Sequence, residues 1–204
     1  MDQHMSSLLG QRFEDALVFA FRLHRRQTRK GSETPFVSHL LGVTDLVLHY
    51  GGSEDQAIAA LLHDAAEDQG GEETLAEIER RFGAKIAAMV RDCSDTTVTP
   101  RPEWEERKKR YLRHLPDVPA ETLLVSAADK LYNVRAILAD YHLVGEQVWK
   151  RFNGGRKGTL WYYRALADEY ARLMPDHPLC AELLRAVAQL EKEAGVVEPS
   201  DWEK

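Results

Sequence analysis

The nine residues "LLHDAAEDQ" (Leu61–Gln69) place one histidine and three carboxylates directly after two leucines. Ionisable side chains are costly to bury beside leucine unless something pairs with them. The ionisable residues are His63, Asp64, Glu67 and Asp68. This composition predicts either a helix end with solvated acids and a core histidine, or a functional site.

The spacing of these four residues fits one face of a helix, where residues three and four apart are neighbours. His63 and Glu67 are four residues apart, as are Asp64 and Asp68. Three carboxylates this close raise one another's pKa unless a cation is present. We therefore expect all four side chains to border one cleft that holds a divalent metal. Imidazole suits transition metals, and carboxylate suits harder ions such as manganese.

Two residues far away in the sequence strengthen the metal interpretation. Asp129 lies inside the apolar run "LLVSAADKLYNV", where an unpaired carboxylate would be costly. His39 follows the basic segment "HRRQTRKG". Together with His63 and Asp64 they make a set of two histidines and two carboxylates. Such a set leaves coordination positions free for water and substrate, as catalytic metal sites do.

Helical periodicity runs along nearly the whole chain, and no segment alternates for long enough to predict a strand. One helix is expected from Ser38 to Gly51–Gly52. Ser53 to Gln56 then reads as a capping box that opens a helix carrying the motif to Gly70–Gly71. Further helices are expected over residues 74–82, 84–93, 103–114, 120–139, 144–152, 159–174 and 179–194. The prediction is an all-α domain of about eight to ten helices over residues 1–196, with a polar tail over 197–204.

The composition is that of an ordinary soluble protein, with 44% apolar and 29% charged residues among 204. The net charge of −6 argues against a nucleic-acid binder. No apolar run approaches the roughly 18 residues of a membrane span, and the N-terminus lacks a signal-peptide layout. Two cysteines in unrelated contexts, Cys93 and Cys180, predict no disulfide framework, so we expect a reducing cytoplasm. Assembly into a homo-oligomer stays open.

The motifs resemble a known family. His39, His63-Asp64 and Asp129 look like the ligand pattern of the HD-domain metal phosphohydrolases. "HRRQTRKGSETPFVSHLLGV", "LLHDAAED" and "AADKLYNVRAI" resemble, in order and at compatible spacing, three blocks of the RelA/SpoT-type alarmone hydrolases. The resemblance covers about residues 13–163, with no attached synthetase or regulatory domain, and implies a stand-alone small alarmone hydrolase with an HD-domain helical bundle.

The resemblance implies a role for each matching residue. The four ligands would hold one Mn²⁺ per chain, and Glu67 and Asp68 would position and deprotonate the attacking water. The reaction would remove the 3′-diphosphate of (p)ppGpp as pyrophosphate, leaving GDP or GTP. The implied substrate contacts are Arg29, which would stack on the purine, Lys30, Tyr132, Asn133, Lys108, Lys157 and Tyr162.

Some residues depart from the family pattern, and several functions stay open. Leu40 stands where the family has a proline after the first ligand histidine, and Trp104 stands where some relatives carry a lysine. Base preference is not readable from one sequence, so the adenosine alarmones ((pp)pApp) are a second possible substrate. A general HD nucleotide or NADPH phosphatase also fits the ligand pattern, as does a nucleotide sensor without turnover.

Overall fold

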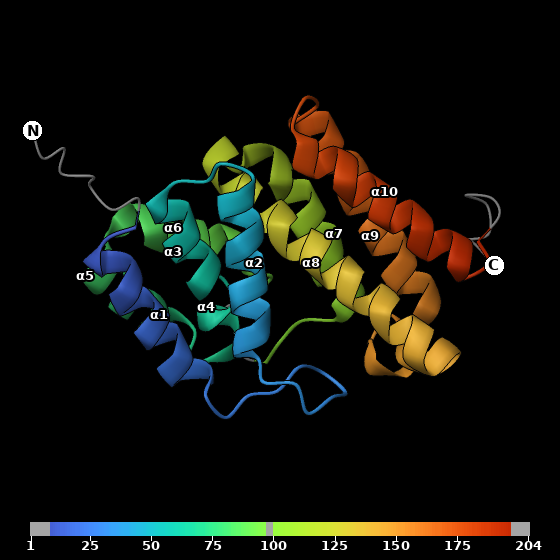
Figure 1. The fold of residues 1–204 in the computed structure, drawn as a ribbon, viewed down its shortest axis with the longest axis horizontal. Coiled ribbons are helices and arrows are strands. Elements are labelled where there is room, and N and C mark those ends of the chain that lie inside the picture. Colours follow the sequence, from blue (N-terminus) through green and yellow to red (C-terminus); the bar gives the residue numbers. More distant parts are fainter. Residues whose placement is uncertain (1–8, 97–99, 197–204) are drawn as a thin grey trace, which may run out of the picture.

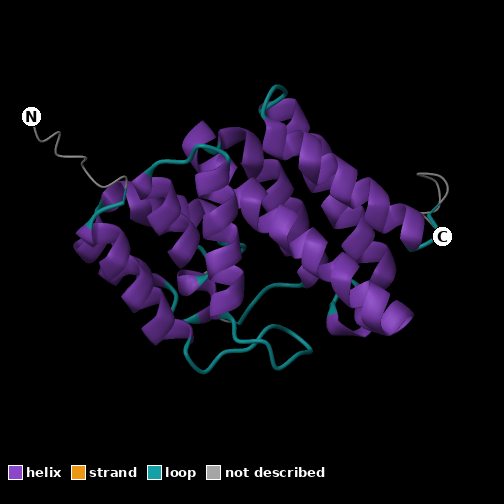
Figure 2. Cartoon of the chain, in the orientation of Figure 1, coloured by secondary structure: helices purple, strands orange, loops and turns teal. Residues whose placement is uncertain are grey.

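The computed structural model describes residues 9–96 and 100–196, and these residues form helices and loops without a strand (Figure 2). The α-helical segments are α1 (Gln11–His24), α2 (Val37–His49), α3 (Glu54–Leu62), α4 (Ala65–Asp68), α5 (Glu72–Phe82), α6 (Ala84–Cys93), α7 (Trp104–His114), α8 (Ala120–Val144), α9 (Gly155–Leu173) and α10 (Pro178–Glu193), with 3₁₀ turns η1 (Leu115–Asp117) and η2 (Gly145–Arg151). The all-α prediction is confirmed. The single domain stays a prediction, and the tail over residues 197–204 lies outside the described part of the chain.

The core forms where α2, α3 and α8 pack together. Figure 1 shows α2 and α8 side by side at the centre, with α1 and α5 on one flank and α9 and α10 on the other. Residues 57–62 of α3 are completely buried. Each buried leucine or isoleucine contributes about 1.5–3 kcal/mol. A helix held this firmly on all sides can fix the residues at its end in space.

The expected end of α2 and the expected start of α3 are confirmed. Gly51 has a positive φ of 82°, and its neighbour Gly52 donates to the Val47 carbonyl at 2.8 Å, which closes α2. In the capping box of α3, Ser53 N–H donates to Gln56 Oε1 at 2.8 Å, and Gln56 N–H donates to Ser53 Oγ at 3.4 Å. The turn between the two helices is therefore set by local sequence.

The prediction of one continuous helix through Leu61–Gln69 is wrong, because the helix is interrupted at His63 and Asp64, between α3 and α4. The imidazole Nδ1 of His63 bonds to the Ala60 carbonyl at 2.8 Å. In a continuing helix that carbonyl would accept from the Asp64 N–H, so the side chain competes with the helix. Asp64 takes up φ −95° and ψ −2°. Two residues adjacent in sequence can thereby point at one place.

Other helix boundaries differ from the prediction around residues 139–159. Helix α8 continues to Val144, and the helix expected over residues 144–152 is the 3₁₀ turn η2. Helix α9 begins at Gly155 in a glycine-rich segment. A Cβ at Gly154 would lie 2.6 Å from the Trp104 indole, and one at Gly158 would lie 3.0 Å from it. The glycines thus admit the indole of α7 against the start of α9.

None of the described helices combines the length and the apolar character needed to cross a membrane.

Candidate metal centre

The four predicted ligands, His39, His63, Asp64 and Asp129, meet in space, and we call them the His–Asp cluster. His39 comes from α2, His63 and Asp64 from the α3–α4 break, and Asp129 from α8. His39 Nε2 lies 3.1 Å from His63 Nε2 and 3.3 Å from both Asp64 Oδ2 and Asp129 Oδ1. His63 Nε2 lies 3.0 Å from Asp64 Oδ2 and 3.6 Å from Asp129 Oδ1. Four side chains from two core helices and the α3–α4 break therefore converge on one point.

The histidines are oriented for ligation. Both are buried, with exposures of 1% for His39 and 2% for His63. The bond from His63 Nδ1 to the Ala60 carbonyl requires the proton on Nδ1, which directs the Nε2 lone pair into the cluster. The Nε2 of His39 faces the same point.

The cluster needs a positive charge at its centre. Burial disfavours a charged His63, but the Asp64 charge and the bonds to Asp129 raise the pKa of His63 well above its ordinary value. Burial likewise opposes ionisation of Asp129, but Lys130 and the two imidazoles hold the pKa of that carboxyl well below its usual range. A divalent cation supplies this charge more fully than a proton. The imidazole nitrogens and the Asp129 carboxylate, which lie within 4.8 Å of one another, suit such an ion.

The Asp129 carboxylate is held by a second layer of side chains. Lys130 Nζ lies 2.6 Å from Oδ2, and Asn133 Nδ2 donates to Oδ1 at 2.5 Å. Arg29 donates from Nη2 to Asn133 Oδ1 at 2.7 Å. These bonds fix the carboxylate orientation, as outer partners of metal ligands do. They also connect Arg29 with the cluster through a single amide.

The structure separates the predicted water-handling pair. Glu67 lines a cavity of about 170 Å³, the inner cavity, together with His39, Asp64 and Asp129. Burial, reinforced by the charges of Asp64 and Asp95, raises the pKa of Glu67. Asp68 does not line this cavity in the described part of the chain.

A second cavity, which we call the aromatic arm, adjoins the inner cavity. It has a volume of about 290 Å³ and shares the lining residues Arg29, Asn133 and Tyr163 with the inner cavity. The Arg29 guanidinium lies 5.9 Å from the ring centroid of Phe36 and 6.0 Å from that of Tyr132. The structure thus brings Arg29, Tyr132 and Asn133 together, and the aromatic arm offers flat surfaces to a planar ligand.

Tyr132 depends on a close approach between two helices. Its ring lies 5.1 Å from the His39 ring, and its hydroxyl donates to the Ser38 carbonyl at 3.3 Å. A Cβ at Gly42 would overlap the Tyr132 ring. The glycine at position 42 of α2 therefore leaves room for the Tyr132 ring.

Positive side chains adjoin the inner cavity on another side. This cationic arm, about 220 Å³, is lined by residues that include Lys30, Arg101, Arg107 and Lys108. Lys108 Nζ lies 2.9 Å from Asp95 Oδ2 and 4.7 Å from the centroid of the Tyr162 ring. Burial, only partly offset by the Asp95 charge, lowers the pKa of Lys108. The predicted contacts Lys30, Lys108 and Tyr162 thus line one arm, which suits phosphate groups.

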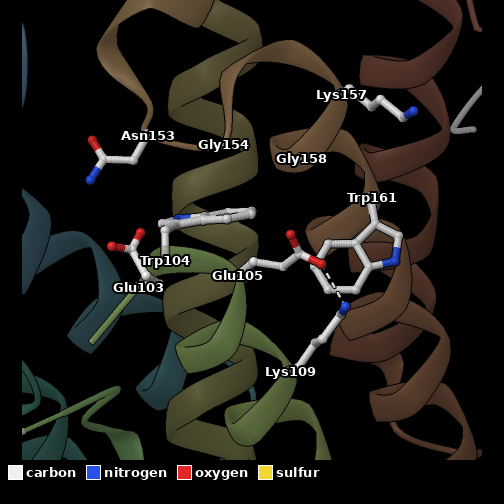
Figure 3. Close-up of a pocket in the computed structure, with 9 residues that line it drawn as sticks. All are labelled: Glu103, Trp104, Glu105, Lys109, Asn153, Gly154, Lys157, Gly158 and Trp161. Atoms are coloured by element: carbon white, nitrogen blue, oxygen red, sulfur yellow. Dashed lines mark hydrogen bonds and ion pairs between the residues drawn. The ribbon is translucent and has the colours of Figure 1, made fainter. Parts of the chain in front are cut away.

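Lys157 is not brought to this place. It lines a wider hollow of about 800 Å³ together with Trp104, Trp161 and Lys109 (Figure 3). In that view the Trp104 indole lies beneath Gly154 and Gly158, and the ion pair between Glu105 and Lys109, 2.5 Å long, is drawn at the same hollow. None of the residues that line this hollow belongs to the described lining of the inner cavity.

Asp95 and Arg101 could not be singled out from the sequence. Asp95 forms ion pairs with Arg107 and Lys108, and its N–H donates to Glu67 Oε2 at 3.0 Å. Arg101 lies 3.2 Å from Asp68 Oδ1. Both come from the segment between α6 and α7, which has no periodicity and contains two prolines. Its charged residues beside "TPRP" were the only signal.

A family model for the HD domain matches residues 16–160. The chain therefore belongs to the HD-domain family. Its similar proteins include the guanosine-3′,5′-bis(diphosphate) 3′-pyrophosphohydrolase MESH1 of Xenopus tropicalis, which is 40% identical over 124 residues, 59% of this chain and 66% of that one. MESH1 of Drosophila melanogaster is 31% identical over 134 residues, 64% of this chain and 72% of that one. The chain thus spans about two thirds of the length of these relatives.

A solved structure described as a metazoan ortholog of SpoT that hydrolyses ppGpp has the same fold, with a TM-score of 0.73 at 23% identity. The alignment covers 94% of this chain and 100% of that one.

Proposed function

We propose that this chain is a metal-dependent phosphohydrolase that removes the 3′-diphosphate of the guanosine alarmones ppGpp and pppGpp as pyrophosphate, using one Mn²⁺ per chain. The observation that carries the proposal is the junction of an aromatic arm and a cationic arm at the His–Asp cluster. A purine nucleotide with several phosphates has both kinds of surface. The MESH1 relatives, whose names state this activity, support the substrate class.

When bound, the cation would lower the pKa of a coordinated water and neutralise phosphate charge. His39, His63, Asp64 and Asp129 would hold it. Glu67, which lines the same cavity, would accept the proton of the attacking water. The water oxygen bonds to the phosphorus next to the ribose, the bond from that phosphorus to O3′ breaks, and O3′ takes up a proton.

The arms would orient the substrate. The Arg29 guanidinium and the ring of Tyr132 would hold the purine, because planar cations and aromatic rings stack on bases. Lys30 and Lys108 would bind phosphate oxygens through charge-assisted hydrogen bonds. The proposed binding partner is thus a small nucleotide substrate rather than a nucleic acid. The proposed compartment is the cytoplasm.

The test is to incubate the purified protein with Mn²⁺ and ppGpp, pppGpp or their adenosine analogues, and to separate the products by anion-exchange chromatography. We expect GDP or GTP and pyrophosphate in equal amounts, and no turnover by the His63→Ala variant. Consumption of only the adenosine nucleotides would contradict the guanosine assignment, and release of single phosphates would indicate a general phosphatase. Metal analysis of the same preparation tests manganese.

A further inference from the structure

Arg101 reaches back from the segment before α7 to both acidic residues of α4. Its Nη1 lies 3.4 Å from Glu67 Oε1, and its Nη2 lies 3.2 Å from Asp68 Oδ1. Nη2 also donates to the Glu67 main-chain carbonyl at 2.7 Å. One guanidinium therefore fixes two neighbouring carboxylates and the backbone between them.

Both oxygens of Asp68 are engaged away from the inner cavity. Oδ1 faces Arg101, and Oδ2 accepts from Gln27 Nε2 at 2.7 Å. Gln27 is held in turn, because its Oε1 lies 2.6 Å from Gln69 Nε2 and 2.8 Å from His24 Nδ1. Asp68 is thus built as an anchor for Arg101.

Glu67 is placed differently. It lines the inner cavity, and it is the member of the pair that shares this cavity with His39, Asp64 and Asp129. Its Oε2 accepts from the Asp95 N–H at 3.0 Å, and its other oxygen faces Arg101. Burial and the neighbouring carboxylates favour the protonated form of Glu67. A nearby guanidinium favours the ionised form, which a base requires.

We infer that Asp68 and Arg101 form a positioning pair: Asp68 holds Arg101, and Arg101 holds the Glu67 carboxylate directed into the inner cavity. Glu67 is then the single base, and Asp68 acts through Arg101. The inference rests on the proposed function only in taking Glu67 as the residue that handles the water.

The kinetic test compares Asp68→Ala, Arg101→Ala and the double variant, with Arg113→Ala, an exposed arginine of α7, as the matched control. We expect each single variant to lower kcat by about ten- to a hundredfold with little change in KM. The double variant should be no slower than the slower single one, because residues acting as a unit are not additive. Arg101→Lys should restore part of kcat. Losses that multiply, or an increase in KM confined to the Arg101 variants, would overturn the inference and make Arg101 a separate phosphate contact.

A second measurement needs no turnover. The ¹³C chemical shift of the Glu67 carboxyl, assigned by its loss in Glu67→Gln, is recorded in the metal-free protein at neutral pH. We expect the same displacement in Asp68→Ala, Arg101→Ala and the double variant. A shift that moves in Arg101→Ala but stays in place in Asp68→Ala would overturn the inference. If the wild-type protein hydrolyses no alarmone, the proposed substrate is wrong. The chemical shifts of Glu67 still test whether Asp68 and Arg101 form a positioning pair.

Discussion

The His–Asp cluster and the Glu67–Asp68–Arg101 group lie side by side but are built in opposite ways. The cluster is drawn largely from core helices, and His39, His63 and Asp129 are buried. The second group sits on the four-residue helix α4 and the segment before α7, and Arg101 is 46% exposed. Rigid elements hold ligands accurately, whereas peripheral elements open at lower free energy. For the proposed mechanism we therefore expect ion binding to depend on the His–Asp cluster in the core, and water activation to depend on the Glu67–Asp68–Arg101 group, which we call the rim.

The largest effect is expected for Asp129→Ala, which tests whether metal binding and stability depend on the His–Asp cluster. This change removes a proposed ligand from the cluster and leaves the largely buried Lys130 without its partner, which lies 2.6 Å away. Breaking a buried ion pair costs about 3–5 kcal/mol. We expect loss of bound metal and activity, and a lower free energy of unfolding of the metal-free protein by that amount. Metal analysis and urea unfolding measure the two effects, and an unchanged stability would show that the pair is solvated.

Glu67→Gln tests the rim alone. The amide keeps the size of the side chain but cannot accept the proton of water, so we expect kcat to fall by about 10²–10⁴-fold. Metal content should stay at the wild-type level, because Glu67 is outside the His–Asp cluster. Loss of metal in this variant would place Glu67 among the ligands and remove the distinction between core and rim.

The pH dependence of stability sharpens the same point. The pKa of Glu67 is raised in the folded state, so between its unfolded and folded pKa values the folded protein binds more protons. The free energy of unfolding therefore falls as the pH rises from the ordinary pKa of a glutamate to the raised pKa of Glu67 in the folded protein. Metal-free Glu67→Gln should lack this decrease. Parallel curves for the two proteins would contradict the burial effect on Glu67.

Gly42→Ala tests how closely the aromatic arm depends on the core. The added methyl group overlaps the Tyr132 ring, and overpacking of this kind costs about 1–3 kcal/mol. We expect a lower melting temperature and a higher KM with little change in metal content. Gly83→Ala, at a positive φ of 96° with open space around its Cβ, is the control for backbone strain. Equal KM values for both variants would separate Tyr132 from substrate binding.

The smallest effect is expected for Lys157→Ala. Lys157 lines the wide hollow beside Trp104 rather than the inner cavity. An exposed charge contributes about 1 kcal/mol or less, which limits the change in kcat/KM to about fivefold. Lys108→Ala, from the cationic arm, is the comparison and should lose considerably more. A larger loss for Lys157 would extend the substrate site into the hollow.

The sequence predicted the chemistry of the core better than that of the rim. His39, His63, Asp64 and Asp129 could be found because charged residues in apolar helices need partners, and the structure brings them together. The break at His63 could not be predicted, because it depends on a side chain competing for the Ala60 carbonyl. Asp95 and Arg101 could not be found because their partners on α4 and α7 come close to them only in the folded chain.

The break between α3 and α4 also sets a limit for redesign. His63 and Asp64 are consecutive, so a single peptide unit separates these two residues of the cluster. The directions of their side chains depend on α3 ending at Leu62. One residue inserted there would turn the following side chains by about 100° around a helix axis. We therefore expect an inserted residue at this junction to turn His63 and Asp64 away from each other and to disrupt the cluster.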